Sequence, residues 1–356
     1  MDKLHFEQRR EKARACMRKA GLAALVVSLD ANRFYLSGFE LHDPQANESA
    51  GCLALMADGA DWLCTDGRFF DAARRIWDEQ RIFIYRGQAM EQVNALLRNK
   101  ARGIVGFEAR QISVEAFDLL APGLSLQRAD GLVESLRLIK APEEIRRLQA
   151  SCLLNHKLMD HLPAILLPGR SEAEVAWDIE RFFRDNGARE AAFSGIVAVG
   201  ANAALPHAEP GEDRIEENSG MLIDVGCRVE DYCSDQTRSF WVGDAPDKEW
   251  RRHLDLVQEA QALAIQGIRP GADLAGIYGL ARKRLDEAGL GELFTHGLGH
   301  GIGLQTHEAP SLNPRAQGVL KAGMVVTVEP GLYVSGRSGV RWEHMVLVTE
   351  DGAVVL

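Results

Sequence analysis

The stretch Met221–Gly243, MLIDVGCRVEDYCSDQTRSFWVG, places two acids inside apolar sequence that is typical of β-strands. Asp224 lies within the apolar run Met221–Val225, and Asp235 lies in the return strand that continues as Thr237–Val242. Strand interiors normally exclude acids, because a buried carboxylate loses its hydration. An antiparallel hairpin would put the two side chains on neighbouring strands, where their carboxylates can converge.

A second region further along the chain repeats this arrangement. Glu329 follows the apolar run Met324–Val328, and Glu343 lies within the apolar segment Val340–Val348. Four acids in or at the ends of hydrophobic strands are costly unless they pair with cations or bind metal ions. Any one of them could be a turn residue or a salt-bridge partner, but four at matching positions favour a metal site.

Two helix-start signals recur at a fixed spacing and predict two αβ halves related by pseudo-symmetry. Pro168–Ser171 precedes a helix that Gly187 closes, and Pro270–Asp273 precedes a helix that Gly289 closes. From 168 to 270 and from 187 to 289 the offset is 102 residues. A Ser or Asp fits the N-cap of each helix, and glycine fits the left-handed residue after it.

The first of these helices has two further signals. Glu174 completes a capping box with Ser171, and Val175, Ile179 and Phe182 form an apolar stripe. We expect this stripe to pack on a sheet. A site between the two halves would draw equivalent ligands from both of them.

The segment Thr295–Pro310, THGLGHGIGLQTHEAP, holds His296, His300 and His307. Glycines at 297, 299, 301 and 303 disfavour a helix, so we expect an extended segment that another group approaches closely. The segment contains neither an HExxH zinc motif nor a GxGxxG dinucleotide motif. His207 occupies the corresponding HAEP motif of the first half. A single histidine is usually structural, whereas this group favours a site.

Four carboxylates with one or two imidazoles form a hard, oxygen-rich ligand set. Such a set suits Mn²⁺, Co²⁺ or Fe²⁺ in a two-metal site better than a zinc site built from Cys and His. A water that bridged two such ions would ionise near neutral pH and supply a hydroxide nucleophile. The remaining histidines could donate to a developing oxyanion or move a proton to the leaving group. These residues predict metal-assisted hydrolysis, with an amide as the favoured substrate bond.

The composition is that of a soluble globular protein, neither disordered nor fibrous. The chain has 356 residues, is 46% hydrophobic and 26% charged, and carries a formal net charge of −10. This acidic balance, without a basic block, argues against a nucleic-acid partner. No apolar run approaches a membrane span, and the charged first residues do not resemble a signal peptide. Six scattered cysteines fit a reducing compartment, so we expect a cytoplasmic protein with no membrane partner.

Residues 21–135 alternate short apolar runs with helix-period stretches, which predicts an αβ domain. The apolar runs lie at 23–27, 52–56 and 104–107, and the helix-period stretches at 69–77 and 90–98. Asp58-Gly59 predicts a hairpin between the run at 52–56 and Trp62–Cys64. The charged segment Arg137–Gln149 then runs into a helix with Pro142 in its first turn. We therefore expect two domains, 1–135 and 136–356.

At these residues the sequence resembles the family of aminopeptidase P, prolidase and methionine aminopeptidase, whose catalytic domain has the pita-bread fold. The family's metal ligands occur in the order Asp, Asp, His, Glu, Glu, in five separate motifs. That order matches Asp224 in LIDVG, Asp235 in YCSDQTR, His300 in GHGIG, Glu329 in VEPG and Glu343 in VRWE. The resemblance covers residues 137–356 and implies an α/β (α+β) pseudo-twofold domain that binds two divalent metal ions.

The resemblance implies roles for further residues. His207 and His307 match the histidines that assist catalysis, His296 matches a further active-site histidine of some members, and Arg341 matches an arginine that orients neighbouring groups. Residues 1–135 resemble the creatinase-type N-terminal domain, which bacterial methionine aminopeptidases lack. Members with this domain often form homodimers, so we expect a homodimer.

Two positions depart from the family's pattern. His344 follows Glu343 where many members have an acid, which points to an altered metal affinity or pH dependence. Ser311 follows HEAP where some prolidases carry an arginine that holds the free carboxylate of a dipeptide. The resemblance therefore implies an Xaa-Pro aminopeptidase whose bridging hydroxide attacks the scissile amide, with Mn²⁺ as the expected metal and Co²⁺, Fe²⁺ or Zn²⁺ as alternatives. An Xaa-Pro dipeptidase (prolidase) is the alternative activity.

A second hypothesis is that the protein has the same fold but no peptidase activity. Creatinase-like relatives hydrolyse small amidino compounds without metal, and other relatives are non-catalytic binding modules. Relatives of these two kinds are recognised by the loss of metal ligands. None of the five candidate ligands is missing from this sequence.

Overall fold

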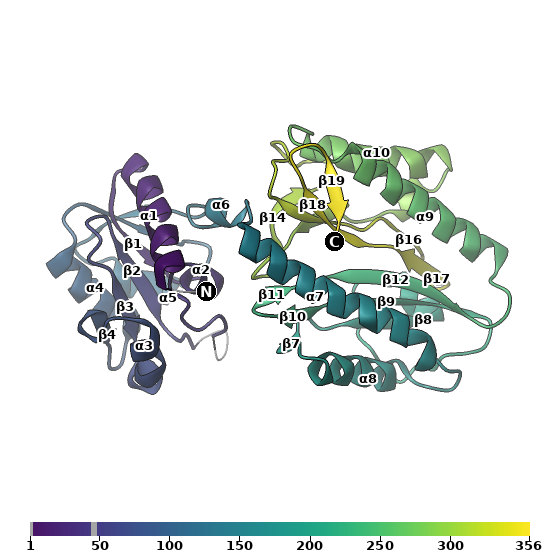
Figure 1. The fold of residues 1–356 in the computed structure, drawn as a ribbon, viewed down its shortest axis with the longest axis horizontal. Coiled ribbons are helices and arrows are strands. Elements are labelled where there is room, and N and C mark those ends of the chain that lie inside the picture. The colour runs from purple at the N-terminus through teal and green to yellow at the C-terminus, as the bar shows by residue number, and fades with distance from the viewer. Residues whose placement is uncertain (1–2, 44–47) are drawn as a thin grey trace. The chain divides into compact units, whose positions relative to one another are not determined.

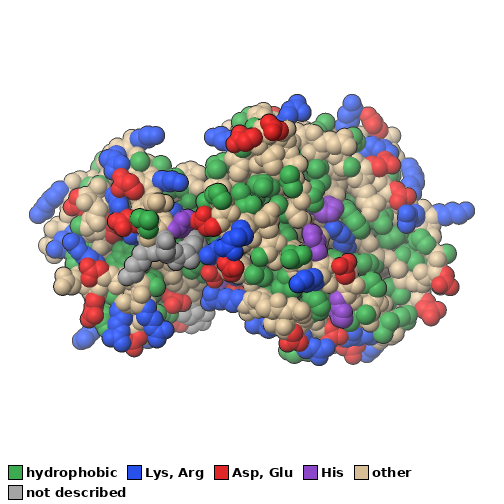
Figure 2. Space-filling view, viewed as in Figure 1, with side chains coloured by type: hydrophobic (Ala, Val, Ile, Leu, Met, Phe, Trp, Pro, Cys, Tyr) green, Lys and Arg blue, Asp and Glu red, His purple; other side chains and the backbone are tan. Residues whose placement is uncertain are grey.

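The computed structural model describes residues 3–43 and 48–356, and the chain divides into two compact units, Met1–Arg137 and Leu138–Leu356. Both units mix helices with sheets (Figure 1). No helix among the described residues is long and apolar enough to cross a membrane. All six cysteines are free. On the face in Figure 2, acidic and basic side chains are interspersed and no basic stripe gathers.

The N-terminal unit is built on one six-stranded sheet with the strand order β4-β3-β2-β1-β5-β6. Its strands are β1 (Leu22–Val27), β2 (Cys52–Met56), β3 (Trp62–Thr65), β4 (Ile82–Ile84), β5 (Ile104–Phe107) and β6 (Ser125–Arg128). Its helices are α1 (Lys3–Lys19), α2 (Asp30–Ser37), α3 (Phe70–Ile76), α4 (Ala89–Lys100), α5 (Val114–Leu120) and α6 (Glu134–Arg137). The strands and helices that the sequence predicted here are present.

The predicted Asp58-Gly59 turn joins β2 to β3 as an antiparallel pair. Gly59 has a φ of 86°, the left-handed region that glycine adopts at little cost. The outer strand pairs β3–β4 and β5–β6 are parallel. Apolar side chains of β1, β2 and β5 pack with those of α4 in one buried cluster.

The C-terminal unit carries four longer helices and several small sheets. The helices are α7 (Pro142–His161), α8 (Glu172–Asp185), α9 (Lys248–Gly267) and α10 (Leu274–Glu287). The first half contributes β7 (Glu190–Ala191), β8 (Ile196–Val199), β9 (Ser219–Val225), β10 (Cys227–Val229), β11 (Tyr232–Cys233) and β12 (Gln236–Val242). The second half contributes β13 (Gly299–Gly301), β14 (Glu308–Leu312), β15 (Val325–Val328), β16 (Gly331–Val334), β17 (Ser338–Arg341), β18 (His344–Val348) and β19 (Ala353–Val355).

The sheets of the C-terminal unit follow the two halves. The first half forms the sheets β12-β9-β8 and β11-β10-β7, and the second forms β14-β13-β15-β18-β19 and β16-β17. Each half packs its own helices on its own apolar core. In Figure 1, α9 and α10 lie along the upper edge of these sheets and α8 along the lower edge.

Matching hydrogen bonds at the two helix starts support the predicted pseudo-symmetry. The amide of Gly169 donates to the carbonyl of Ile215 at 2.8 Å, and that of Gly271 donates to the carbonyl of Leu320 at 2.9 Å. The next residues make isolated antiparallel bridges, Ser171 with Arg214 and Asp273 with Val319. The start of each helix is therefore held to a later segment of its own half in the same way.

The predicted helix caps are present, with one correction to the apolar stripe. Ser171 and Glu174 form the capping box of α8. Val175, Ile179 and Phe183 are the buried residues of the stripe, whereas Phe182 is only half-buried. Positions spaced by four lie above one another on a helix, so Phe183 rather than Phe182 completes the row.

Candidate functional site

One cavity of the C-terminal unit, of about 1200 Å³, collects nearly all the residues that the sequence singled out. Its lining includes His207, Asp224, Asp235, His296, His300, His307, Glu329 and Arg341. Glu343 lies behind this lining and is 1% exposed. Both halves of the unit contribute, as expected for a site between two pseudo-equivalent halves.

The two aspartates come from the strand pair β9–β12, as predicted. Asp224 lies in β9, and Asp235 directly precedes β12, whose Thr237 pairs with Asp224. The chain between them forms the small hairpin β10–β11, which leaves the main sheet. Gly226 permits this departure, because a Cβ there would lie 2.0 Å from the carbonyl oxygen of Ser234.

Replacing Gly226 by alanine is expected to disturb the site as well as the fold. The added methyl would push Ser234 away and change the spacing between Asp224 and Asp235. We expect a loss of about 1–3 kcal/mol in unfolding free energy and at least a tenfold drop in hydrolytic activity. Gly279→Ala in α10 is the matched control, because nothing lies within 4 Å of its Cβ position. Normal activity and stability of Gly226→Ala would contradict this account.

Each of the two glutamates lies just after the end of a strand, and the expectation of one continuous strand around Glu343 was wrong. Glu329 directly follows β15, as predicted. Glu343 does not lie inside a continuous strand over Val340–Val348, because β17 ends at 341 and β18 begins at 344. The chain changes partner here, since β17 pairs with β16 and β18 pairs with β15. The backbone amide of Glu343 donates instead to the carbonyl of Thr237 at 3.2 Å.

The glycine-rich histidine segment is extended, as expected, and neighbouring backbone approaches it closely. His300 lies in β13, between Gly299 and Gly301. A Cβ on Gly299 would lie 2.0 Å from the carbonyl oxygen of Thr327, and one on Gly301 would lie 2.1 Å from that of Ala309. Only glycine allows β13 to pack this tightly between β15 and β14.

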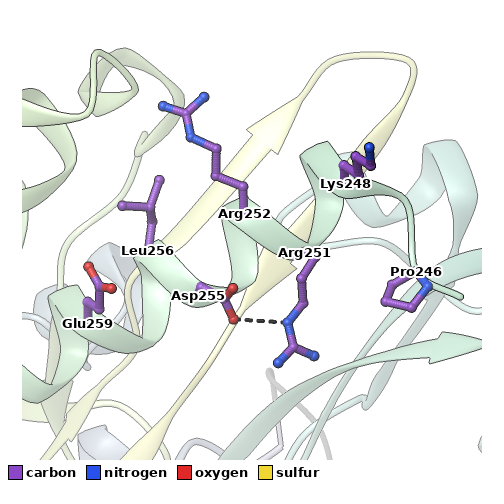
Figure 3. A pocket seen from close by; sticks show the side chains of 7 residues that line it. All are labelled: Pro246, Lys248, Arg251, Arg252, Asp255, Leu256 and Glu259. Carbon is purple, nitrogen blue, oxygen red and sulfur yellow. Dashed lines mark ion pairs between the residues drawn. The ribbon is translucent and has the colours of Figure 1, made fainter.

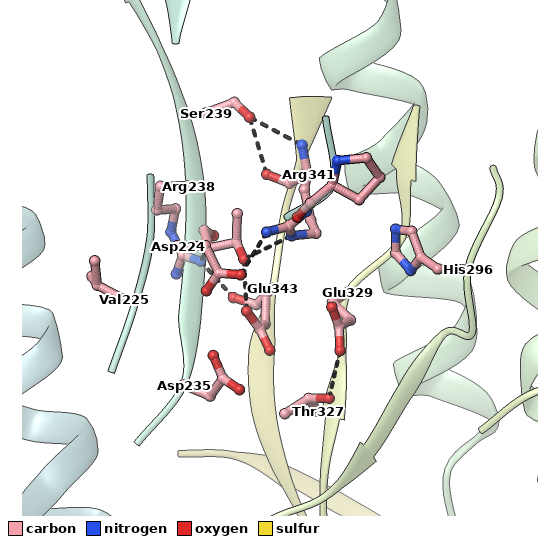
Figure 4. Close-up of polar contacts among 12 residues, drawn as sticks. Asp224, Val225, Asp235, Arg238, Ser239, His296, Thr327, Glu329, Arg341 and Glu343 are labelled. Atoms are coloured by element: carbon pink, nitrogen blue, oxygen red, sulfur yellow. Dashed lines mark hydrogen bonds and ion pairs between the residues drawn. The ribbon is translucent and has the colours of Figure 1, made fainter. Parts of the chain in front are cut away.

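The donor atoms of this cluster fit divalent cations. One donor atom each from Asp235, His300 and Glu343 lies within 4.8 Å of the others. Nε2 of His300 lies 3.6 Å from Oδ2 of Asp235 and 3.3 Å from Oε1 of Glu329. Figure 4 shows the carboxylates of Asp224, Asp235, Glu329 and Glu343 turned toward a common space. Buried like charges this close are costly without cations between them.

Two buried carboxylate oxygens reinforce this interpretation. Oδ1 of Asp224 and Oε1 of Glu343 have no hydrogen-bond partner among the described residues. Their second oxygens are held, since Arg341 donates to Oδ2 of Asp224 at 2.5 Å and Thr237 donates to Oε2 of Glu343 at 2.7 Å. Each side chain is thus oriented by one oxygen and leaves the other for a cation.

In the metal-free protein, the crowding of buried carboxylates shifts the pKa values of the candidate ligands. Burial, then the charges of neighbouring carboxylates, raise the pKa of Asp235 and of Glu343 well above their usual values. Burial opposes ionisation of Glu329 too, but the hydrogen bond and charge of His300 lower its pKa to about 2. Burial lowers the pKa of His300, but its hydrogen bond to Glu329 and the charge of Glu329 raise this pKa by more, so the net shift is upward.

A hydrogen-bond chain links the candidate ligands to His296, and the sequence did not reveal its middle member. Arg341 donates to the hydroxyl of Tyr333 at 2.7 Å, and that hydroxyl lies 2.9 Å from Nε2 of His296. Nδ1 of His296 lies 2.7 Å from the carbonyl oxygen of Gly297 and donates to it. In the neutral imidazole, Nε2 then accepts from the hydroxyl of Tyr333. Burial lowers the pKa of His296 and so favours this neutral form.

The two remaining histidines lie at the accessible side of the cavity. His207 and His307 are exposed, and the ring of His307 packs edge-on against that of His300 with centroids 4.3 Å apart. Burial, then the charge of His300, lower the pKa of His307. Arg341 also donates to the carbonyl of Pro206 at 3.2 Å, so the segment before His207 is tied to the same network.

A second depression, of about 400 Å³, lies on α9 and does not share these features (Figure 3). It is lined by Pro246, Lys248, Arg251, Arg252, Asp255, Leu256 and Glu259. Arg251 pairs with Asp255 one turn later at 3.0 Å. Alternating charges of this kind are typical of a solvated helix face.

Comparisons with known proteins agree with this geometry. Residues 146–350 match the profile of metallopeptidase family M24, and residues 9–139 match the creatinase/prolidase N-terminal domain. The chain is 35% identical over 277 residues to an Xaa-Pro dipeptidase of Pyrococcus furiosus, which covers 78% of this chain and 79% of that protein.

Solved structures extend the likeness to the whole fold. An Xaa-Pro dipeptidase from Bacillus anthracis superimposes with a TM-score of 0.91 at 32% identity, over 98% of this chain and 97% of that one. An X-Pro aminopeptidase from Thermotoga maritima superimposes with a TM-score of 0.83 at 28% identity, over 96% and 97% of the two chains. The C-terminal unit thus has the pita-bread fold, and the N-terminal unit is of the creatinase type. The chain belongs to metallopeptidase family M24, a membership that implies divalent metal ions.

Proposed function

We propose that this protein is a dinuclear metal-dependent Xaa-Pro aminopeptidase, which releases the N-terminal residue that precedes proline. The observation that carries the proposal is the convergence of five candidate ligands on one cavity that also holds three further histidines and an arginine. The assigned ligands are Asp224, Asp235, His300, Glu329 and Glu343. The proline preference is taken from the names of the relatives, which act on Xaa-Pro substrates. Mn²⁺ is the proposed metal, because the ligands are mainly carboxylates.

Two divalent ions at such a site supply Lewis-acid charge and a water that is deprotonated near neutral pH. The protein's own residues supply position and protons. His207 and His307 are exposed to the cavity, where their N–H groups can donate to the oxygen that becomes negative in the tetrahedral intermediate. Because burial and His300 lower the pKa of His307, its neutral form can also accept and return a proton.

Arg341 acts through the groups that it orients. It is 3% exposed and donates to Asp224 and to Tyr333. Tyr333 in turn contacts Nε2 of His296, and burial of His296 favours the neutral imidazole, which adds no positive charge beside the metal ions. We assign His296 and Arg341 to positioning of the ligand shell and of the substrate.

The proposed activity predicts cleavage of peptides of the form Xaa-Pro-Yaa after addition of Mn²⁺. The expected product is the free first residue, with kcat/KM at least tenfold higher than for the matching Xaa-Pro dipeptide, because Ser311 lines the cavity where an anchoring arginine would be required. Release of the residue can be followed by chromatography or mass spectrometry. Equal release from Xaa-Ala-Yaa peptides would contradict the proline preference.

An Xaa-Pro dipeptidase is the second candidate, and Arg315 is the observation that favours it. Arg315 lines the same cavity, and none of the described carboxylates makes an ion pair with it. Its guanidinium could hold the free carboxylate of a dipeptide in place of an arginine at 311. If Arg315→Ala removes dipeptide hydrolysis and leaves tripeptide cleavage intact, the dipeptidase is favoured.

The remaining assignments concern the whole chain. We assign residues 1–135 to a creatinase-like N-terminal domain and 136–356 to the catalytic domain. We further propose a cytoplasmic homodimer whose substrate is a peptide and not a nucleic acid. Sedimentation or light scattering of the purified chain tests the dimer.

A further inference from the structure

A half-buried arginine lies beside the backbone of the candidate ligand Glu343, and its hydrogen-bond partners are all neutral. Arg238, on β12, donates through Nη1 to the carbonyls of Thr237 and Glu343. Its guanidinium lies 4.3 Å from the ring centroid of Trp342. Among the described residues no carboxylate makes an ion pair with Arg238, although the more distant carboxylate of Glu343 acts on its charge.

The remaining contact of Arg238 determines which form His344 takes. Nη2 of Arg238 lies 2.9 Å from Nε2 of His344. A guanidinium has donors and no acceptor, so this Nε2 must be unprotonated and accept the hydrogen bond. On the other side, Nδ1 of His344 lies 3.0 Å from Oε1 of Gln261 and is the only ring nitrogen left to carry a proton.

The orientation of Gln261 agrees with this assignment. Its amide nitrogen donates to the carbonyls of Val328 at 2.7 Å and Trp342 at 3.1 Å, which leaves Oε1 to accept from His344. The hydrogen bonds thus run in one direction, from His344 to Gln261 and from Arg238 to His344. Every donor and acceptor in this hydrogen-bond network is consistent with a neutral His344.

We propose that His344 is a positioning residue whose neutral ring, held by Gln261, leaves the charge of Arg238 without an ion-pair partner beside the backbone of Glu343 and thereby lowers the affinity of the five-ligand cluster for divalent cations. The sign follows from charge. A cation close to a low-dielectric site repels a second cation that enters it, and an acid at position 344 would cancel that repulsion. The inference rests on the metal site of the proposed function and adds a residue that tunes it.

The test measures binding of Mn²⁺ alone to the metal-free, full-length chain by calorimetry or electron paramagnetic resonance. His344→Asp places a carboxylate beside Arg238, and we expect Mn²⁺ to bind about tenfold more tightly than in the wild type. His344→Asn is the matched neutral control, with an expected change of less than about threefold. A purely structural role would weaken binding in both variants.

A second pair of variants keeps the proposal testable if His344→Asp does not fold. Arg238→Gln removes the cation and is expected to tighten Mn²⁺ binding, whereas Arg238→Lys keeps the cation and is expected not to. Unchanged or weaker Mn²⁺ binding by folded His344→Asp, or by folded Arg238→Gln, overturns the inference. Absence of Mn²⁺ binding by the wild type overturns the proposed metal function itself, so the two failures are distinguishable.

Discussion

Asp235→Asn is expected to lower kcat/KM for an Xaa-Pro-Yaa peptide at least a thousandfold and, at the same time, to raise the Tm of the metal-free protein. The side chain keeps its shape but loses the charge that a divalent cation requires. Asp235 is 6% exposed, and burial and the charges of Glu343, Asp224 and Glu329 disfavour its ionised form. Removing this charge relieves the repulsion, and each kcal/mol gained raises Tm by about 2–4 °C in a unit of this size.

The opposite signs of the two effects separate loss of a ligand from loss of the fold. Activity is measured with Mn²⁺ added, and Tm is measured by calorimetry after thorough chelation. Asp231→Asn is the matched control, because Asp231 lies in the turn of the neighbouring hairpin and pairs with Arg189 outside the cavity. If Asp235→Asn keeps activity within tenfold of the wild type, Asp235 is not an essential ligand.

Chelation of divalent ions is expected to abolish activity and to lower Tm by an amount that grows from pH 5 to pH 8. In the metal-free protein the pKa values of Asp235 and Glu343 are raised, so the native state binds protons that the unfolded state has already lost. Its stability therefore falls as pH rises from the unfolded pKa through the native one. His300, whose pKa is also raised, contributes in the same direction above its unfolded value.

Glu329 acts in the other direction only at lower pH. Its pKa of about 2 stabilises the native state above the unfolded value, and this contribution is lost as pH falls toward 2. Bound Mn²⁺ supplies the missing positive charge, and at a hundredfold excess over Kd it adds about 2.7 kcal/mol. Paired melting curves with Mn²⁺ and with chelator at several pH values check this. A difference in Tm that does not change with pH would contradict it.

Much of the fold was predictable because its signals are local. The capping box of Ser171 and Glu174 and the Asp58-Gly59 turn depend on residues only a few positions apart. The glycines around His300 predicted an extended segment with close neighbours, and the tight contacts of Gly299 and Gly301 bear this out. The error at Phe182 arose because two neighbouring phenylalanines both fit an apolar stripe, and only packing separates them.

The sequence predicted which residues form the site, but not the hydrogen bonds that connect them. Tyr333 joins Arg341 to His296, and Thr237 orients Glu343, yet no motif marks either residue. The break between β17 and β18 at Glu343 was missed for a related reason. An apolar run predicts a strand but does not say with which strand it pairs, and here the pairing changes within the run.

The order of residues by itself determined the kinds of ligand, their sequence along the chain, the helix caps and the duplicated halves, because each depends on residue type and short spacing. Only the tertiary structure decided which carboxylate oxygens stay free, that Tyr333 contacts His296, and that Arg238 lies beside Glu343 with His344 as its neutral partner. These depend on contacts such as that between Thr237 and Glu343, 106 positions apart, whose geometry is set by how the two halves pack. Short-range sequence patterns carry no information about such packing.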